Sequence, residues 1–283
     1  MDYSASRSRR RAVALVFVLI AVFFARNTRR RTSHSTSQEQ QPASTARYVP
    51  DSSEGLGASV AILLDNSGSM KDRAGSDSRA KYLVAREALE AVLATTDSFV
   101  ARQPDFPVKV GLYQFSSDAV PLVPVQPYDR AMLRTALESM PFPKGGTAIG
   151  SAMELARADL YRAGTIRKYI LVLTDGENTE GPAPAKVARE IDQRSDGAVR
   201  MYFVAFDVSA ERFDFVRDVH GEVLGASNGP ALRMSLDSIY RGKILAESMD
   251  AGETLADTSQ RSATALAPDS GRAARTPPPP RKP

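Results

Sequence analysis

The sequence predicts an α/β fold, with a doubly wound, mostly parallel open sheet, helices on both faces and one antiparallel edge strand. Apolar runs of strand length alternate with helical periods along the middle of the chain. Several runs are apolar at every position, which is typical of strands covered on both faces. One further run contains Pro121 and Pro124, and proline restricts a strand to the edge of a sheet.

The expected strands follow from these runs. Residues 60–64, 169–173 and 201–206 are continuously apolar, and the alternating apolar residues of 108–112 mark another strand. The proline-containing run at 119–125 is expected to form a hairpin with 108–116. In a sheet of strand order 3-2-1-4-5-6, the order reverses between strands one and four, and functional sites lie there at the carboxyl ends of the strands.

Helical spacing recurs between the expected strands. In 79–97, Tyr82, Ala85, Leu89 and Val92 share one face of a helix, while charged residues occupy the others. The same kind of pattern occurs in 151–163. The complete set of expected helices is 79–97, 129–139, 151–163, 184–195, 210–219 and 230–247.

Four regions are expected along the 283 residues. Residues 1–31 form a basic N-terminal segment, and Ser, Thr and Gln make 32–57 a flexible linker. Residues 58–249 form one domain that is large enough for a substantial core. Residues 250–283 lack an apolar period and end in four consecutive prolines before Arg281, so a disordered, Pro-rich tail is expected there.

An apolar run at 12–25 has four arginines closely before it and four closely after it. As a helix it would span about 21 Å, against about 30 Å for the hydrocarbon core of a bilayer. The arginines downstream resist translocation, and no clean small-residue cleavage site follows the run. We therefore expect an uncleaved single-pass anchor, with a cleavable signal peptide as the alternative.

Composition excludes several kinds of chemistry. The chain contains no cysteine, which excludes disulfides, thiolate zinc sites and cysteine nucleophiles. It has only two histidines, His34 and His220, too few for an imidazole metal cluster, and we interpret both as structural residues. Nine arginines and two acidic residues give 1–47 a net charge of +7, whereas 48–249 carries −4. The basic excess therefore lies outside the expected domain, and nucleic-acid binding by that domain is not expected.

Oxygen-bearing side chains follow the two strands that flank the expected switch point. Asp65, Ser67 and Ser69 form a D-x-S-x-S pattern at the end of the first strand, and Asp175 ends the 169–173 strand in T-D-G. Thr147 follows two glycines in a loop between expected helices. Carboxylate and hydroxyl oxygens suit a hard divalent cation, so Mg²⁺ is the expected ion, with Mn²⁺ or Ca²⁺ as alternatives.

This ligand set predicts docking rather than catalysis. Neutral hydroxyls donate weakly and two carboxylates at most neutralise the ion, which leaves it electrophilic. Mg²⁺ also keeps water ligands readily. A carboxylate from another molecule is then the natural occupant of the remaining coordination position.

These motifs resemble the metal-ion-dependent adhesion site of von Willebrand factor type A (VWA) domains. All five motif positions match, and the resemblance covers roughly residues 58–245. It implies that Ser67, Ser69 and Thr147 contact the metal, and that Asp65 and Asp175 act directly or through water. It further implies that an acidic residue of a partner protein completes the metal shell.

Other functions on similar folds lack required residues. A haloacid-dehalogenase phosphatase needs a second aspartate where Ser67 stands, and a phosphate-binding loop needs Lys-Ser/Thr where Ser151-Ala152 stands. No G-x-G-x-x-G follows a strand. A hydrolase with Asp65 as nucleophile would require turnover that Asp65→Asn abolishes. The remaining alternative is an accessory subunit of a chelatase or AAA+ ATPase, against which the apolar run at 12–25 argues.

The sequence thus predicts a non-enzymatic, bacterial-type, membrane-anchored VWA protein. It is expected to bind an acidic residue of another protein through Mg²⁺, and to use neither nucleic acid nor a small-molecule substrate. We expect the anchor at 12–25 to lie in the bacterial inner membrane with the domain on the extracytoplasmic side, or the protein to be secreted if the segment is cleaved. Four arginines on each side of the run leave the orientation open by charge alone.

Overall fold

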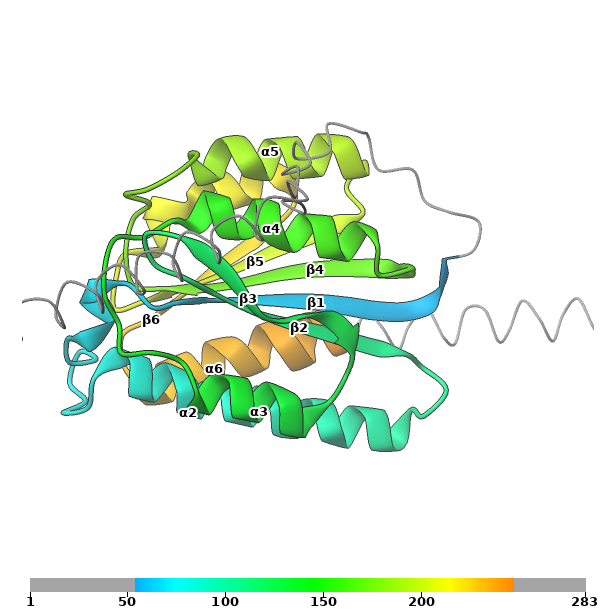
Figure 1. Cartoon of the computed structure of the whole chain (residues 1–283), viewed down its shortest axis with the longest axis horizontal. Helices are drawn as coiled ribbons and strands as arrows, with labels where there is room; N and C mark the ends of the chain where they lie inside the picture. The colour runs from blue at the N-terminus through cyan, green and yellow to red at the C-terminus, as the bar shows by residue number, and fades with distance from the viewer. Residues whose placement is uncertain (1–53, 247–283) are drawn as a thin grey trace, which may run out of the picture. The chain divides into compact units, whose positions relative to one another are not determined.

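The computed structural model describes residues 54–246, which form a six-stranded sheet with helices on both faces (Figure 1). The strand order is β3-β2-β1-β4-β5-β6, and β3 alone pairs in the antiparallel direction. The predicted fold class is confirmed, and the order is the one in which the first and fourth strands flank the switch point. The strands are β1 (Gly55–Asp65), β2 (Val108–Phe115), β3 (Ala119–Pro127), β4 (Thr165–Thr174), β5 (Val199–Phe206) and β6 (Glu222–Ala226).

Helices cover the sheet in two layers, with α4 and α5 on one face and α2, α3 and α6 on the other (Figure 1). The three short helical segments η1, η2 and η3 complete the domain. The bounds are η1 (Gly68–Lys71), α2 (Lys81–Arg102), α3 (Arg130–Glu138), α4 (Ile149–Tyr161), α5 (Pro184–Ser195), η2 (Ala210–Val219), α6 (Gly229–Ile239) and η3 (Tyr240–Leu245).

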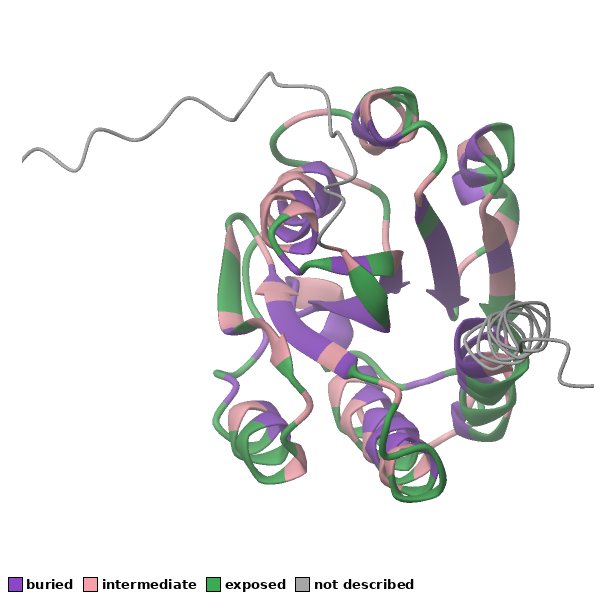
Figure 2. Ribbon diagram, turned by 90° about the vertical axis from the view of Figure 1, so that its right-hand side faces the viewer, coloured by how far each residue is buried: buried purple, intermediate pink, exposed green. Residues whose placement is uncertain are grey.

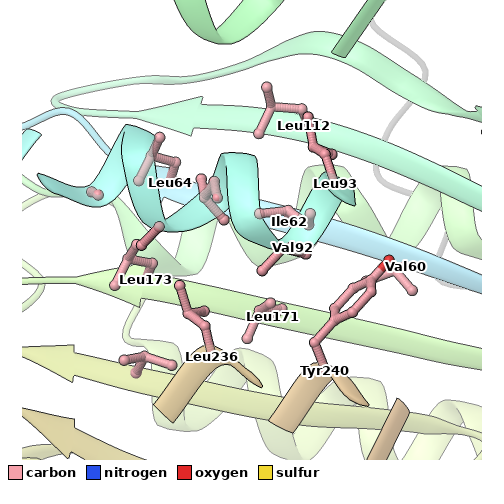
Figure 3. Packing of buried hydrophobic residues seen from close by; sticks show 14 of the residues in the cluster. Val60, Ile62, Leu64, Val92, Leu93, Leu112, Leu171, Leu173, Leu236 and Tyr240 are labelled. Carbon is pink, nitrogen blue, oxygen red and sulfur yellow. The ribbon is translucent and has the colours of Figure 1, made fainter. Parts of the chain in front are cut away.

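The core is divided between the two faces because successive side chains of a strand point in opposite directions. On β1, Ile62 and Leu64 belong to the cluster under α2, α3 and α6, whereas Leu63 belongs to the cluster under α4 and α5. Figure 3 shows the first cluster, in which Val92 and Leu236 pack with Ile62. The central strands are buried, the edge strand β3 is largely exposed, and so are the outward helix faces (Figure 2). Burial on both faces explains the continuously apolar strand sequences.

Three elements differ from the sequence-based expectation. The helix expected at 230–247 is α6 followed by a π-helix, η3, and 210–219 is a 3₁₀ helix with a kink at Phe213. Strand β6 was not predicted, because five residues that begin with Glu222 and include Gly225 give no continuous apolar run. It pairs with β5 through Phe203 and Val223, among other residues.

The described domain begins slightly earlier than predicted. Strand β1 starts at Gly55, three residues before the expected boundary at 58, and the Gly55 N–H donates to the Gly164 carbonyl over 3.2 Å. Within 54–246, no helix has the length and apolarity needed to cross a membrane. The predicted anchor at 12–25, the predicted tail at 250–283 and nearly all of the predicted linker lie outside the described residues.

Candidate metal centre

The predicted site residues come from three loops at the carboxyl ends of β1 and β4. These two strands are neighbours in parallel register, with Leu64 opposite Leu173, so Asp65 and Asp175 leave the sheet at the same edge. The sheet order reverses here, since β2 lies on the other side of β1 and β5 on the other side of β4. The third loop precedes α4 and carries Thr147.

Asp65 is enclosed at the end of β1, with 1% of its surface exposed. The backbone N–H of Ser67 donates to Asp65 Oδ1 over 2.8 Å, which folds the chain back immediately after the strand. The Thr174 hydroxyl donates to Oδ2 over 2.6 Å from the neighbouring strand. Each carboxylate oxygen thus has a protein donor and keeps further acceptor capacity.

A chain of oxygen contacts links β1 to β4. Ser67 Oγ lies 3.1 Å from Ser69 Oγ, and Ser69 Oγ donates to Asp175 Oδ1 over 2.8 Å. Asp175 is 106 residues from Ser69 in the sequence, so the parallel pairing of the strands creates this contact. Ser67 is buried and Ser69 is half-buried, so the cluster opens toward solvent on the Ser69 side.

Thr147 joins the cluster from the third loop. A Cβ atom added to Gly176 would lie 3.8 Å from Thr147 Oγ1 and 3.9 Å from Ser69 Oγ, so both hydroxyl groups face Gly176. The backbone of Thr147 is held on both sides, since its N–H donates to Thr179 Oγ1 over 2.8 Å and its carbonyl accepts from the Thr179 N–H over 2.8 Å. A side chain at Gly146 would collide with Thr179 Oγ1 at 2.7 Å, which explains a glycine there.

The sequence analysis missed Lys81, the first residue of α2. Its ammonium group lies 3.0 Å from Asp175 Oδ2 and 3.1 Å from Asp207 Oδ2. Lys81 is 7% exposed and therefore supplies a nearly buried positive charge at the predicted site. No local motif identifies it, because 94 residues separate it from Asp175.

Burial sets the electrostatics of the site. Desolvation raises the pKa of Asp65 to about 6; hydrogen bonds from Thr174 and Ser67 oppose this rise, and the charge of Asp175 adds to it. Desolvation disfavours the charge on Lys81, but hydrogen bonds and charges from Asp175 and Asp207 outweigh it and raise the pKa of the ammonium group. Additional positive charge next to Asp65 would therefore stabilise its buried carboxylate.

These residues fit a hard divalent cation. Three hydroxyls and two carboxylates are gathered at one place, and the buried carboxylate of Asp65 would be stabilised by additional positive charge. No group of three or more His, Cys, Asp or Glu side chains in 54–246 is placed to hold a metal, so hydroxyl oxygens would supply part of the ligand set at this site. Ser67, Ser69 and Thr147 could ligate through hydroxyl oxygens, and Asp65 and Asp175 through carboxylate oxygens or water.

Comparison with known families identifies the domain. The model of the von Willebrand factor type A domain matches residues 59–222. The chain belongs to this family, as the fold and the motifs at the strand ends predict. VWA domains generally mediate protein–protein interaction. A comparison with curated proteins found no match.

Solved structures share the fold at low sequence identity. The PilB minor pilin from Streptococcus sanguinis, as a D319A mutant, is 14% identical with a TM-score of 0.56, covering 69% of this chain and 63% of the pilin. An aerotolerance-related membrane protein from Bacteroides fragilis is 20% identical with a TM-score of 0.51, covering 66% of this chain and 99% of that one. A von Willebrand factor type A structure from Catenulispora acidiphila is 22% identical with a TM-score of 0.51, covering 65% and 42%.

Proposed function

We propose that this VWA domain is a Mg²⁺-dependent protein-binding module that docks an acidic residue of a partner protein. The observation that carries the proposal is the continuous set of contacts from Asp65 through Ser67 and Ser69 to Asp175, with Thr147 facing the same Gly176. When bound, the ion would supply an electrophilic coordination position for the partner's carboxylate. Mn²⁺ or Ca²⁺ would fit the same oxygen ligands.

The role of each residue follows from its burial. Asp65 and Ser67 lie at the closed end of the cluster and would hold the ion from within, whereas half-buried Ser69 lies toward solvent. Lys81 would orient Asp175 by holding Oδ2, while Ser69 holds Oδ1. The partner therefore approaches the ion from the Ser69 side.

A binding function is favoured over a hydrolytic one. Asp65, the only candidate nucleophile that the sequence suggests, is 1% exposed, and both of its oxygens accept hydrogen bonds. A nucleophilic carboxylate must reach the reacting atom of its substrate. We therefore propose a non-enzymatic role. From the apolar run at 12–25, we further propose that the chain is attached to a bacterial membrane with the VWA domain on the extracytoplasmic side.

Affinity capture with the full-length chain from solubilised membranes tests this function. Retention of a partner in Mg²⁺, its loss in EDTA and its loss with Asp65→Asn are expected. Asp105→Asn is the matched control, because Asp105 is an exposed carboxylate in the loop before β2, at the opposite end of the sheet. Replacing one acidic residue of the captured partner by its amide should abolish retention. A partner retained equally in EDTA would contradict the proposal.

A further inference from the structure

An exposed aromatic side chain stands beside the proposed metal site. Phe142 is 64% exposed, although phenylalanine is usually buried. It lies between Pro141 and Pro143 in the loop that connects α3 to α4. This loop continues through exposed Lys144 to Thr147, so it connects Phe142 directly to the site.

Hydrogen bonds attach this loop to the turn after β1. The Asn66 side-chain amide donates to the Pro141 carbonyl over 3.3 Å, and the Lys144 N–H donates to the Asn66 carbonyl over 3.0 Å. The Gly68 N–H donates to the Gly145 carbonyl over 3.0 Å. The residues before and after Phe142 are thereby held against the D-x-S-x-S turn.

The ring of Phe142 is also held by a contact with helix α2. It packs edge-on against Tyr82 of α2 with ring centroids 5.7 Å apart. The guanidinium of Arg86 lies 5.2 Å from the centre of the Tyr82 ring and donates to the Met140 carbonyl over 2.8 Å. Two flanking prolines further restrict the backbone. An aromatic side chain that is already ordered loses little entropy on binding, which is the property of an interface anchor.

We infer that Phe142 is a second docking point, and that it selects partners carrying a large apolar side chain close to the metal-bound acidic residue. The inference rests on the proposed function. Lys144 adds a positive charge next to Phe142, which complements an acidic segment. The partner recognised is therefore an extended acidic-apolar segment of a protein.

The spacing within that segment follows from the loop. Extended chain advances about 3.4 Å per residue, and hydrogen-bonded neighbouring segments lie about 5 Å apart. Phe142 belongs to a segment hydrogen-bonded to the metal-binding turn, so an apolar side chain within three residues of the acidic one would reach it. A compact motif is expected rather than two distant contacts.

Selection of a random phage-displayed peptide library on the immobilised full-length chain tests this inference. Peptides bind in Mg²⁺ and are eluted with EDTA. The wild-type chain should enrich an acidic residue followed or preceded within three positions by Leu, Ile, Phe, Tyr or Trp. Phe142→Ser should keep the acidic preference and lose the apolar one, with the affinity of a selected peptide falling roughly tenfold.

Matched variants separate the effect from a general loss of apolar surface. Ile166→Ser replaces a side chain that is 51% exposed at the start of β4, away from the site, and should select the same peptides as wild type. Phe142→Leu should retain the apolar preference. Unchanged Mg²⁺ binding by Phe142→Ser would show that the metal site is intact in that variant.

The outcomes distinguish the two proposals. Acidic peptides without an apolar preference on the wild-type chain would overturn the role of Phe142 and leave the proposed function standing. An apolar preference that survives Phe142→Ser would also overturn the role of Phe142. If EDTA elutes no enriched acidic peptide from the wild-type chain, both proposals are contradicted.

Discussion

The carboxylate of Asp65 is an unfavourable buried charge in the metal-free protein, and the same carboxylate is proposed to hold the metal. It is enclosed at the end of β1 and has a pKa raised to about 6 by burial. A free carboxylate has a pKa near 4 in the unfolded chain, so the folded protein without a metal is less stable at neutral pH by about 3 kcal/mol than if this group were neutral. A bound cation would offset that cost.

Replacing this carboxylate by an amide should therefore have two opposite effects. Asp65→Asn is expected to abolish Mg²⁺ binding and to stabilise the metal-free protein by about 1–3 kcal/mol, because it removes the buried charge. Urea unfolding in EDTA and calorimetric titration with Mg²⁺ measure the two effects. Exposed Asp105→Asn should change neither quantity. A destabilised Asp65→Asn protein in EDTA would show that hydrogen bonding to the carboxylate outweighs its desolvation.

The same carboxylate predicts a pH dependence. Because the folded pKa lies above the unfolded one, the wild-type chain loses stability as pH rises from about 4 to about 6, relative to Asp65→Asn. Well below pH 4 Asp65 is protonated in both states, so the stability difference between the two proteins should stop changing with pH. Unfolding of both proteins in EDTA at pH 4, 5, 6 and 7 measures it. A stability difference that does not change across this range would contradict the raised pKa.

At the scale of elements, helix α2 contributes a positive charge to the site, in addition to the side chains that follow the strands. Lys81, at its first residue, joins Asp175 after β4 to Asp207 after β5. The helix start therefore bridges the two carboxylates that follow these neighbouring strands. A cation this near to Asp175 also competes with a metal for the same negative charge.

Removing that competing cation should increase the dependence on metal. Lys81→Met is expected to destabilise the metal-free chain by about 2–3 kcal/mol, because it leaves a buried carboxylate without its partner. Mg²⁺ should restore part of this loss, so the rise in Tm between EDTA and Mg²⁺ should exceed that of the wild-type chain. Lys81→Arg is the control that keeps the charge. An equal or smaller rise for Lys81→Met would contradict the competition.

Helix α4 must approach the loop after β4 closely for Thr147 to face the site. A Cβ at Gly150 would lie 2.1 Å from the Pro182 carbonyl, and the Gly150 N–H donates to Asn178 Oδ1 over 3.2 Å. Gly150→Ala should therefore cost about 1–3 kcal/mol in unfolding free energy. Gly242→Ala is the matched control, because an added Cβ there meets nothing within 4 Å. Equal stability of the two variants would contradict this packing.

Several elements and most of the candidate site could be predicted from local sequence. The buried strands are continuously apolar, and the motifs at Asp65 and Asp175 directly follow two of them, so their position at one edge follows from parallel pairing. Lys81 could not be predicted, since its partners are remote in sequence. Strand β6 gave no signal because it is short and contains glycine. The position of Phe142 beside the site could not be predicted either, because it depends on hydrogen bonds between two loops that are remote in sequence.

At the scale of the whole molecule, the VWA fold brings three separate loops to one edge of the sheet, and the account depends on these loops holding one cation together. The motif positions are fixed by strands that are buried on both faces. A partner bound at that edge would contact the ion, the Ser69 side of the cluster and Phe142.

Crystals of the full-length chain grown with Mn²⁺ test the central claim most directly, because the anomalous signal of the ion locates it independently of any assumed ligand. The account predicts one anomalous peak at the carboxyl ends of β1 and β4, in contact with Ser67, Ser69 and Thr147, and no peak there in Asp65→Asn. A Mn²⁺ peak elsewhere on the domain, with none among these residues in the wild-type chain, would contradict the account.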